Sequence, residues 1–476
     1  MASAIDRRRI IIGLLVIVIS ATLVWFGDGL NPIWPLMWIA PLPVLLIAAW
    51  PAGQVAGIAF LSWFVGFFTY YHYLHRMQFP WLPVFLVEAL LFVLSVLLYR
   101  ALLLRRSPWM AMLAFPSIWV AFEYLVSFAP STGTAGSLSY TQLRFLPVLQ
   151  LASITGPWGI TFAVLLFSST LAVALHVRRS APRQAGHIAI AGLGAIAVVL
   201  VYGSLRLAGP AVQQPVKAGL IVSDLPANES VAAAGPDATR LFRDYAAQAQ
   251  KLAGQGAAVI VMPEKVAVVA DSNPREADAA FQPIADQSGV TLVVGVLRDA
   301  PPHRYNRALV YRPNLPPVTY DKQHMLPPFE SPLTPGSSLT LLSGPRGTWG
   351  VAICKDLDFA DPARSYGRSG AGLLLVPAWD FNIDRVWHGH IAIMRGVEDG
   401  FSIVRAAKHG YLTVSDDRGR IVAEARSDSA PFATLLASVP TAHHATIYLR
   451  LGDWFAWLAL VLLVISLARL TLQRKS

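Results

Sequence analysis

The sequence is poor in two classes of residue, cysteine and charged residues. It has a single cysteine, Cys354, among 476 residues. One cysteine excludes an intramolecular disulfide and any metal site built from several cysteines. Charged residues make up only 14% of the chain and hydrophobic residues 55%, proportions that exclude an ordinary soluble protein. The composition therefore predicts a membrane protein.

The hydrophobic residues are concentrated in long runs with almost no charge. Each run approaches the roughly 20 residues that a helix needs to cross the hydrocarbon core of a bilayer. The runs cover residues 10–26, 33–50, 54–75, 81–104, 109–127, 157–177, 187–208 and 453–472. We predict about eight spans in three regions, namely a membrane domain of seven spans over 1–209, an extramembrane domain over 210–452, and a last span with its tail over 453–476.

Arginine and lysine are distributed unevenly over the short loops, and such an excess marks the cytoplasmic side. With a cytoplasmic N-terminus, the inside flanks hold twelve of these residues and the outside segments hold three, Arg76, Arg144 and Arg206. No small-x-small cleavage site follows the first apolar run, so we expect it to remain as a helix. We therefore expect both termini in the cytoplasm and residues 210–452 on the other side. The net charge of +10 then reflects topology and gives no reason to invoke nucleic acid.

From Pro215 onward the pattern changes to short apolar runs that alternate with polar helical stretches. The runs "AAVIVMPE", "VTLVVGVL", "WGVAICKD" and "GLLLVPAW" are typical of buried strands, and "DATRLFRDYAAQAQKLAG" of an amphipathic helix. This alternation predicts an α/β domain. In such domains the chemistry tends to lie at the carboxyl ends of strands, where loops converge.

Three polar groups occupy such strand ends. Glu264 ends "VIVMPE", Cys354 ends "GVAIC", and Lys322 lies in the loop "TYDKQHMLPPFE". A carboxylate, an ammonium and a thiol are the base, charge stabiliser and nucleophile that covalent acyl transfer needs. Each of the three could also be a structural charge, and a lone cysteine is often a small buried hydrophobe.

The ordered set "PE" at 263–264, "DKQHMLPPFE" at 321–330 and "CKDLDF" at 354–359 resembles the Glu-Lys-Cys signature of the nitrilase (carbon-nitrogen hydrolase) superfamily. The spans on both sides make the chain similar to one family within it, the apolipoprotein N-acyltransferases. The stretches "GSLSYTQLRFLPVLQLASITGPWGITF" and "HIAIMRGVEDGFSIVRAAKHG" also resemble that family, the second through His390, Arg395, Glu398 and Arg405. The resemblance covers nearly the whole chain and implies an αββα sandwich in the extramembrane domain.

The resemblance implies an N-acyltransferase of the bacterial inner membrane with a periplasmic catalytic domain. Glu264 would take the proton from Cys354, whose thiolate attacks a phospholipid ester, with phosphatidylethanolamine as the expected donor. Lys322 would stabilise the oxyanion, and the resulting thioester would pass its acyl chain to the N-terminal α-amine of a diacylated lipoprotein. A thiol of ordinary pKa about 8.5 is only slightly ionised at neutral pH, so a base and a cation are needed, and Lys322 and Lys355 are candidate cations.

Several positions depart from the family pattern. The family commonly has Cys-Tyr-Glu where this chain has Cys354-Lys355-Asp356, and it has Asn-Asp-x-Trp-Phe where this chain has "VPAWDF". Asp356 is a candidate to replace the family's glutamate, and "CKDLDF" also resembles the form found in soluble amidases. A membrane-anchored amidase, an acyltransferase for another amine, and a non-catalytic membrane scaffold therefore stay open as alternatives.

Four further residues are candidates for supporting roles. Glu330 matches a glutamate in the family's loop and could orient Lys322 or Glu264, although it could also be a solvated charge. Trp379 and Phe329 could line an entrance for the acyl chain or simply pack in the core and the loop. With Asp356, these complete the predicted supporting set.

No cofactor and no metal are expected, and other ionisable residues leave their roles open. His388 and His390 lack a cysteine or carboxylate at a spacing familiar from metal sites. Glu88 and Glu123 lie inside predicted spans, where ionisable side chains are costly. They could be functional, or they could pair with histidine or tyrosine residues inside the helix bundle.

Overall fold

The computed structural model describes residues 2–209, 215–228, 230–272 and 274–472. The chain divides into two compact units. One comprises Met1–Phe128, Gly136–Ala208 and Leu451–Ser476, and we call it the membrane unit. The other comprises Ala129–Ala135 and Gly209–Arg450, and we call it the catalytic unit. The division differs from the predicted regions by one or two residues at two boundaries and by one short segment, Ala129–Ala135, which follows a membrane helix in sequence but belongs to the catalytic unit.

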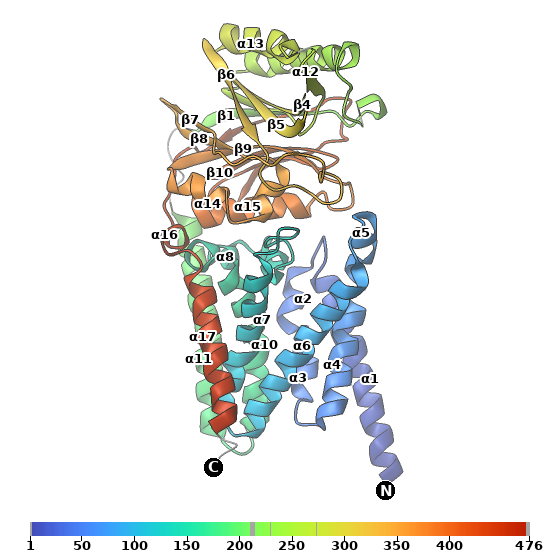
Figure 1. Ribbon diagram of the computed structural model, residues 1–476. Helices are drawn as coiled ribbons and strands as arrows, with labels where there is room; N and C mark the ends of the chain where they lie inside the picture. Colours follow the sequence, from blue (N-terminus) through green and yellow to red (C-terminus); the bar gives the residue numbers. More distant parts are fainter. Residues whose placement is uncertain (1, 210–214, 229, 273, 473–476) are drawn as a thin grey trace. The chain divides into compact units, whose positions relative to one another are not determined.

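The membrane unit is a bundle of long apolar helices (Figure 1). Among the described residues, seven helical segments are long and apolar enough to cross a membrane. They are α1 (Ala2–Gly27), α4 with η1 and α5 (Ala52–Gly66, Phe67–Tyr70 and Tyr71–Arg76), α6 (Trp81–Leu104), α7 (Pro108–Val126), α10 (Pro157–Val177), α11 (Pro182–Ala208) and α17 (Trp454–Leu472). A multi-pass membrane protein, as predicted from the composition, is confirmed.

The run 33–50, predicted as one continuous span, is instead broken into two short helices. These are α2 (Trp34–Ile39) and α3 (Leu42–Leu46). Pro41 and Pro43 lie at the break, and proline supplies no backbone N–H and clashes with the preceding helical turn. Hydroxyl groups of neighbouring helices satisfy carbonyls there, since Ser20 Oγ donates to Ala40 and Ser168 Oγ donates to Trp38, both at 2.5 Å. A broken helix is tolerated inside a bundle for this reason.

Three short helices join α7 to α10, and a buried glutamate holds the first of them. They are η2 (Leu138–Gln142), α8 (Leu146–Leu149) and α9 (Ala152–Thr155). Glu123 on α7 accepts hydrogen bonds from Ser137 Oγ at 2.9 Å, the Leu138 N–H at 2.7 Å and Thr161 Oγ1 at 2.8 Å. In the described part of the chain its hydrogen-bond partners thus include hydroxyl and N–H groups of Ser137, Leu138 and Thr161, and not the histidine or tyrosine residues that one of the two alternatives named. The carboxylate instead connects α7 with η2 and α10.

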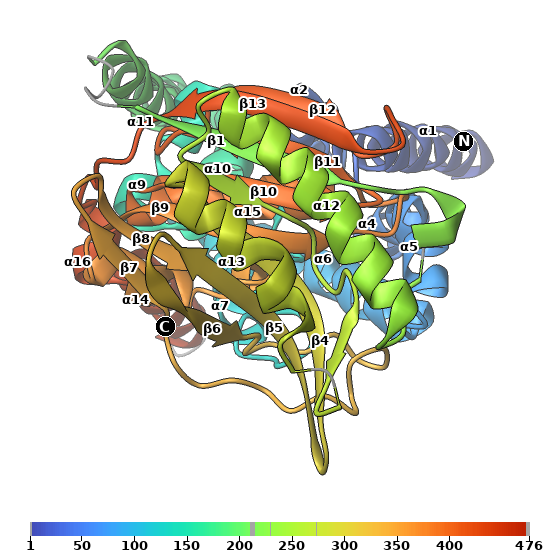
Figure 2. The same cartoon turned by 90° about the horizontal axis from the view of Figure 1, so that it is seen from above.

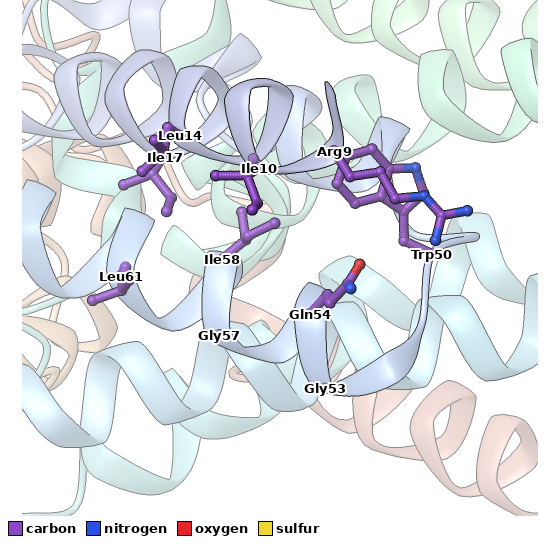
Figure 3. Close-up of a pocket in the computed structure, with 11 residues that line it drawn as sticks. Arg9, Ile10, Leu14, Ile17, Trp50, Gly53, Gln54, Gly57, Ile58 and Leu61 are labelled. Atoms are coloured by element: carbon purple, nitrogen blue, oxygen red, sulfur yellow. The ribbon is translucent and has the colours of Figure 1, made fainter. Parts of the chain in front are cut away.

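Helices α1 and α4 leave a groove of about 300 Å³ between them (Figure 3). Gly53 and Gly57 on α4 line it, and no atom lies within 4 Å of the place where a Cβ of either would be. Arg9 lies at one end of the groove, with its guanidinium 6.0 Å from the centre of the Trp50 ring. The groove owes its space to these glycines, and none of the predicted catalytic residues lines it.

The catalytic unit contains two mixed β-sheets. The seven-stranded sheet has the order β13-β1-β2-β4-β5-β6, with β3 also paired to β4, and the six-stranded sheet has the order β12-β11-β10-β9-β8-β7. The strands of the first are β1 (Val216–Val222), β2 (Val259–Val261), β3 (Val268–Ala270), β4 (Thr291–Ala300), β5 (His303–Arg312), β6 (Leu315–Asp321) and β13 (Ala433–Val439). The strands of the second are β7 (Leu341–Gly344), β8 (Gly347–Val351), β9 (Ala371–Trp379), β10 (Ser402–Lys408), β11 (Tyr411–Ser415) and β12 (Ile421–Arg426).

Helices cover the outer face of each sheet, giving four layers (Figures 1 and 2). Helices α12 (Pro236–Gly254) and α13 (Glu276–Ser288) lie on the seven-stranded sheet, and α14 (Ala363–Arg368) and α15 (Trp387–Asp399) lie on the six-stranded sheet. Short helices η3 (Pro226–Asn228), η4 (Cys354–Asp358) and α16 (Ile447–Leu451) complete the described elements. A central apolar core, with members such as Val261, Val293 and Leu375, separates the two sheets. The predicted αββα sandwich is confirmed.

Candidate active site

The three predicted reactive residues follow the ends of three strands in the catalytic unit. Lys322 comes directly after β6, Glu264 follows β2, and Cys354 begins η4 shortly after β8. The backbone N–H of Glu264 donates to the carbonyl of Ala378 on β9 at 3.3 Å, so the strand ends of both sheets meet here. The candidate site is therefore supported by ordered strands on both sides.

Lys322 lies between two buried carboxylates. Its Nζ donates to Glu264 Oε1 at 2.9 Å and to Glu330 Oε2 at 2.7 Å, and all three side chains are almost inaccessible to solvent. An ammonium has three N–H groups, so one remains to face a reacting group after these two bonds are made. The structure thus brings together Lys322 and both predicted carboxylates, and it excludes a solvated position for Glu330.

Asn306 completes this cluster and was not predicted. It lies on β5, is fully buried, and donates from Nδ2 to Glu264 Oε1 and to Glu330 Oε1, the latter at 2.7 Å. The amide therefore bridges the two carboxylates. A signal was present in the sequence, because Asn306 shares the inward-facing register of β5 with Ala308 and Val310, where a polar residue needs a buried partner.

Mutual attraction keeps the Lys322 ammonium and the Glu330 carboxylate ionised although both are buried. Burial alone would lower the pKa of Lys322, but the carboxylates of Glu264 and Glu330 outweigh it and raise the pKa well above its ordinary value. Burial would raise the pKa of Glu330, but the Lys322 and Lys265 ammonium groups outweigh it and lower that pKa. Lys265 Nζ lies 2.6 Å from Glu330 Oε1. The cluster therefore presents a permanent cation next to ionised carboxylate.

Cys354 occupies an uncommon backbone conformation at the start of η4. Its φ of +44° lies in the left-handed region, which non-glycine residues adopt only where their surroundings hold them. The Sγ thiol donates to the carbonyl of Trp379 at 3.6 Å. Burial, with a further contribution from the charge of Glu264, raises the pKa of the Cys354 thiol, while Lys322 and Arg405 oppose this rise. The thiol is thus protonated at neutral pH and needs a base in order to react.

Asp356 fixes the turn of Cys354 to the loop of Lys322. One oxygen, Oδ2, accepts from the Ile353 N–H at 3.0 Å and from the Tyr320 hydroxyl at 2.7 Å. The other, Oδ1, accepts from the N–H groups of Gln323 at 3.0 Å and His324 at 2.9 Å. The carboxylate is fully buried, so its four bonds serve the internal geometry of the site. Its predicted part in substrate binding stays a prediction.

We expect Asp356→Asn to lower activity and stability together. An asparagine replaces one acceptor oxygen with an NH₂ group, which leaves at least one buried donor without an acceptor at a cost of about 1–3 kcal/mol. The apparent melting temperature in detergent should fall, and the acyl-transfer rate should fall at least about tenfold as the Lys322 loop loosens. Asp361→Asn, at an exposed carboxylate nearby, is the control. Equal behaviour of the two variants would contradict the assigned role of Asp356.

Lys355, the other candidate cation for the thiol, has a carboxylate partner of its own. Its Nζ is paired with Asp358 Oδ2 at 3.0 Å and lies 5.7 Å from the centre of the Phe359 ring. This pairing neutralises its charge locally. Lys322, followed by Arg405, is the cation that opposes the rise in the pKa of Cys354 most strongly.

The remaining predicted residues surround the cluster. Trp379 ends β9, and the ammonium of Lys408 lies 4.2 Å from the centre of its ring. Phe329 is 46% exposed, and its ring lies 5.6 Å from that of Phe381. Trp379 is half-buried and Phe329 is exposed, and the predicted contact of these two rings with an acyl chain stays a prediction.

A buried ion pair that the sequence did not predict acts on the thiol through its charges. Arg405 on β10 donates through both terminal nitrogens to Asp380, at 2.9 and 2.6 Å. Asp380 directly follows β9, so the rule that singled out Glu264 and Cys354 applied to it as well. Arg395 pairs with Glu398 within α15 at 2.9 Å, which accounts for two of the other residues that carried the resemblance.

Comparison with known proteins accounts for both units. Residues 20–170 match the sequence family described as Apolipoprotein N-acyltransferase N-terminal domain, and residues 230–439 match the family described as Carbon-nitrogen hydrolase. An Apolipoprotein N-acyltransferase of Geobacter metallireducens is 29% identical, with 99% of this chain and 97% of the relative covered. One from Gloeobacter violaceus is 25% identical over 97% of this chain and 95% of the relative.

A solved structure of an amidase from Nesterenkonia sp. is 20% identical, with a TM-score of 0.42, and covers 52% of this chain and 97% of the amidase. The four-layered unit, with a glutamate, a lysine and a cysteine at its strand ends, defines a carbon-nitrogen hydrolase domain attached to a membrane unit. The chain is similar to apolipoprotein N-acyltransferases over nearly its whole length, and it is an N-acyltransferase.

Proposed function

We propose that this enzyme transfers a fatty acyl chain from a phospholipid, through a thioester on Cys354, to the N-terminal α-amine of a diacylated lipoprotein. The observation that carries the proposal is the cluster in which Lys322 Nζ lies between Glu264 and Glu330. Phosphatidylethanolamine is the proposed donor. The proposed location is the bacterial inner membrane, with both termini cytoplasmic and the catalytic unit periplasmic.

In the first half of the reaction, Cys354 attacks the ester carbonyl of the donor. The thiol is protonated, because burial raises its pKa, so attack requires transfer of its proton to Glu264. The contacts of the Glu264 carboxylate with Asn306 and Lys322 both fall on Oε1, which leaves Oε2 to take the proton. The remaining N–H of Lys322 and a backbone N–H beside Cys354 stabilise the oxyanion. Glu264 then protonates the leaving lysophospholipid, and a thioester remains on Cys354.

In the second half, the α-amine of the lipoprotein attacks the thioester. Glu264 accepts the proton of the amine, the same oxyanion site stabilises the tetrahedral intermediate, and the thiol of Cys354 leaves and recovers its proton. The exposed ring of Phe329 and the ring of Phe381 are proposed to contact the acyl chain, because both are apolar and lie in loops next to the charged cluster. Both substrates carry lipid anchors, which explains why the catalytic unit is attached to membrane helices.

Intact mass spectrometry tests this proposal directly. The purified enzyme is incubated first with phosphatidylethanolamine and then with a diacylated lipopeptide, next to Cys354→Ser as the control. Wild type should gain the mass of one acyl chain and lose it to the peptide amine, whereas the serine variant should gain none. Release of the acyl chain only to water or to another amine would contradict the proposed acceptor. Absence of any adduct would contradict the phospholipid donor.

A further inference from the structure

The segment Ala129–Ala135 enters the catalytic unit next to the nucleophile turn. It follows α7 in the chain, and it belongs to the catalytic unit rather than to the membrane unit. Thr134 within it donates twice to a single acceptor, the carbonyl oxygen of Asp358. The backbone N–H lies 2.8 Å and the side-chain Oγ1 2.9 Å from that oxygen. A carbonyl oxygen has two lone pairs, so Thr134 alone saturates it.

This close approach requires the glycine that precedes Thr134. Gly133 has a φ of +55°, and a Cβ on it would lie 2.4 Å from the Asp358 oxygen. Any side chain would therefore force the segment away from Asp358. The segment is itself folded tightly, since the N–H of Gly133 donates to Ala129 and the N–H of Ala135 donates to Thr132, both at 3.1 Å.

Asp358 is the last residue of η4, the short helix that Cys354 begins. The last carbonyls of a helix have no partner within the helix and need one from elsewhere. Thr134 supplies this partner, while the Asp358 side chain is occupied by Lys355 at 3.0 Å and lies 3.4 Å from His388 Nδ1. The turn is thus fixed at its start by the bond from the Ile353 N–H to Asp356 and at its end by Thr134.

We infer that Thr134 is a positioning residue for Cys354, a role that rests on the proposed function of Cys354 as nucleophile. The left-handed conformation of Cys354 persists only while both ends of η4 are held. Loss of the hydrogen bond from the Thr134 hydroxyl to the Asp358 carbonyl lets the turn relax and moves the thiol out of reach of Glu264. A segment that directly continues a membrane helix thereby sets the geometry of the nucleophile.

Thr134→Val tests this inference, with Thr132→Val as the matched control. Valine keeps the shape of threonine and the backbone N–H but removes the hydroxyl donor. The hydroxyl of Thr132, in the same segment, is buried and has no hydrogen-bond partner within the described part of the chain. Because Cys354 is the only cysteine, the mass of the intact protein reports its acylation without labelling.

We expect Thr134→Val to lower kcat for acylation of Cys354 about tenfold or more, with KM for phosphatidylethanolamine and the melting temperature near those of wild type. Thr134→Ser should restore the rate, and Thr132→Val should match wild type. A rate for Thr134→Val equal to that of Thr132→Val would overturn the inference, as would a change in KM alone.

A separate readout distinguishes failure of this inference from failure of the proposed function. If wild type itself forms no acyl adduct, the phospholipid mechanism fails, and hydrogen exchange of the amides over residues 354–358 then decides the role of Thr134. Faster exchange in Thr134→Val than in Thr132→Val supports the hold on η4. Equal exchange in the two variants overturns it.

Discussion

Replacing Lys322 with methionine is expected to reduce the rate of Cys354 acylation about 10²–10³-fold, the loss typical of removing one oxyanion donor. The same change should lower stability by about 3–5 kcal/mol, because it removes the cation between two buried carboxylates. Within the described chain, Lys322 is the only lysine whose Nζ lies within 3 Å of both the Glu264 and the Glu330 carboxylates. The two effects are measured by single-turnover acylation and by thermal unfolding in detergent.

Lys265→Met is the matched control for this loss. Lys265 Nζ also contacts Glu330, at 2.6 Å, but it lies 3.6 Å from Glu264 and its side chain is 19% exposed. The variant should therefore lose some stability while keeping its acylation rate within about tenfold of wild type. Comparable losses of rate in the two variants would show that the total positive charge of the cluster, and not the position of Lys322, is what matters.

Glu264→Gln is expected to change two properties of Cys354 in opposite directions. Acyl transfer should fall about 10²–10⁴-fold, because the variant lacks the base that accepts the thiol proton. Alkylation of the thiol by a small reagent should instead become faster at neutral pH. Burial and the Glu264 charge raise the pKa of Cys354, so removing that charge lowers the pKa and increases the thiolate fraction. Each unit of pKa lowered raises that fraction about tenfold where little thiolate is present.

The measurement is the rate of Cys354 alkylation as a function of pH, followed by intact mass. In wild type the rate should rise only above the ordinary pKa of a thiol, and in Glu264→Gln the whole profile should move to lower pH. Glu330→Gln serves as the control, since it removes the other carboxylate of Lys322 and should leave the profile near that of wild type. A profile that moves to higher pH in Glu264→Gln would contradict the assignment of Glu264 as the charge that holds the proton on sulfur.

The positions of Glu264, Lys322 and Cys354 could be singled out by a local rule, and their roles came from the resemblance to the nitrilase superfamily. Glu264, Lys322 and Cys354 each follow a strand, and strand ends gather at the edge of a sheet, so position along the chain was informative. Asn306 obeys no such rule. It lies within β5, and its meeting with two carboxylates from other segments depends on the register of β4, β5 and β6, which no local pattern specifies.

The membrane spans could be predicted from hydropathy, with one exception of identifiable cause. The run 33–50 has the length and apolar character of a span, but its prolines interrupt the hydrogen bonds of a helix. Hydropathy measures transfer into lipid and contains no term for this interruption. The sequence also did not predict that Ala129–Ala135 belongs to the catalytic unit, because seven polar and small residues between two helices have the composition of an ordinary loop.

The proline break between α2 and α3 has a consequence for the compartment in which acyl transfer takes place. Within the described residues, six long apolar segments end at or before Ala208, an even number that by itself would return the chain to the side on which it began. The broken pair provides one further passage, because α1 ends at one end of the bundle and α4 begins at the other (Figure 1). On the proposed topology, these seven passages place the N-terminus and the Cys354 thiol on opposite sides of the membrane. If that topology holds, the least regular passage of the bundle is the one that puts the thiol on the outer face of the membrane.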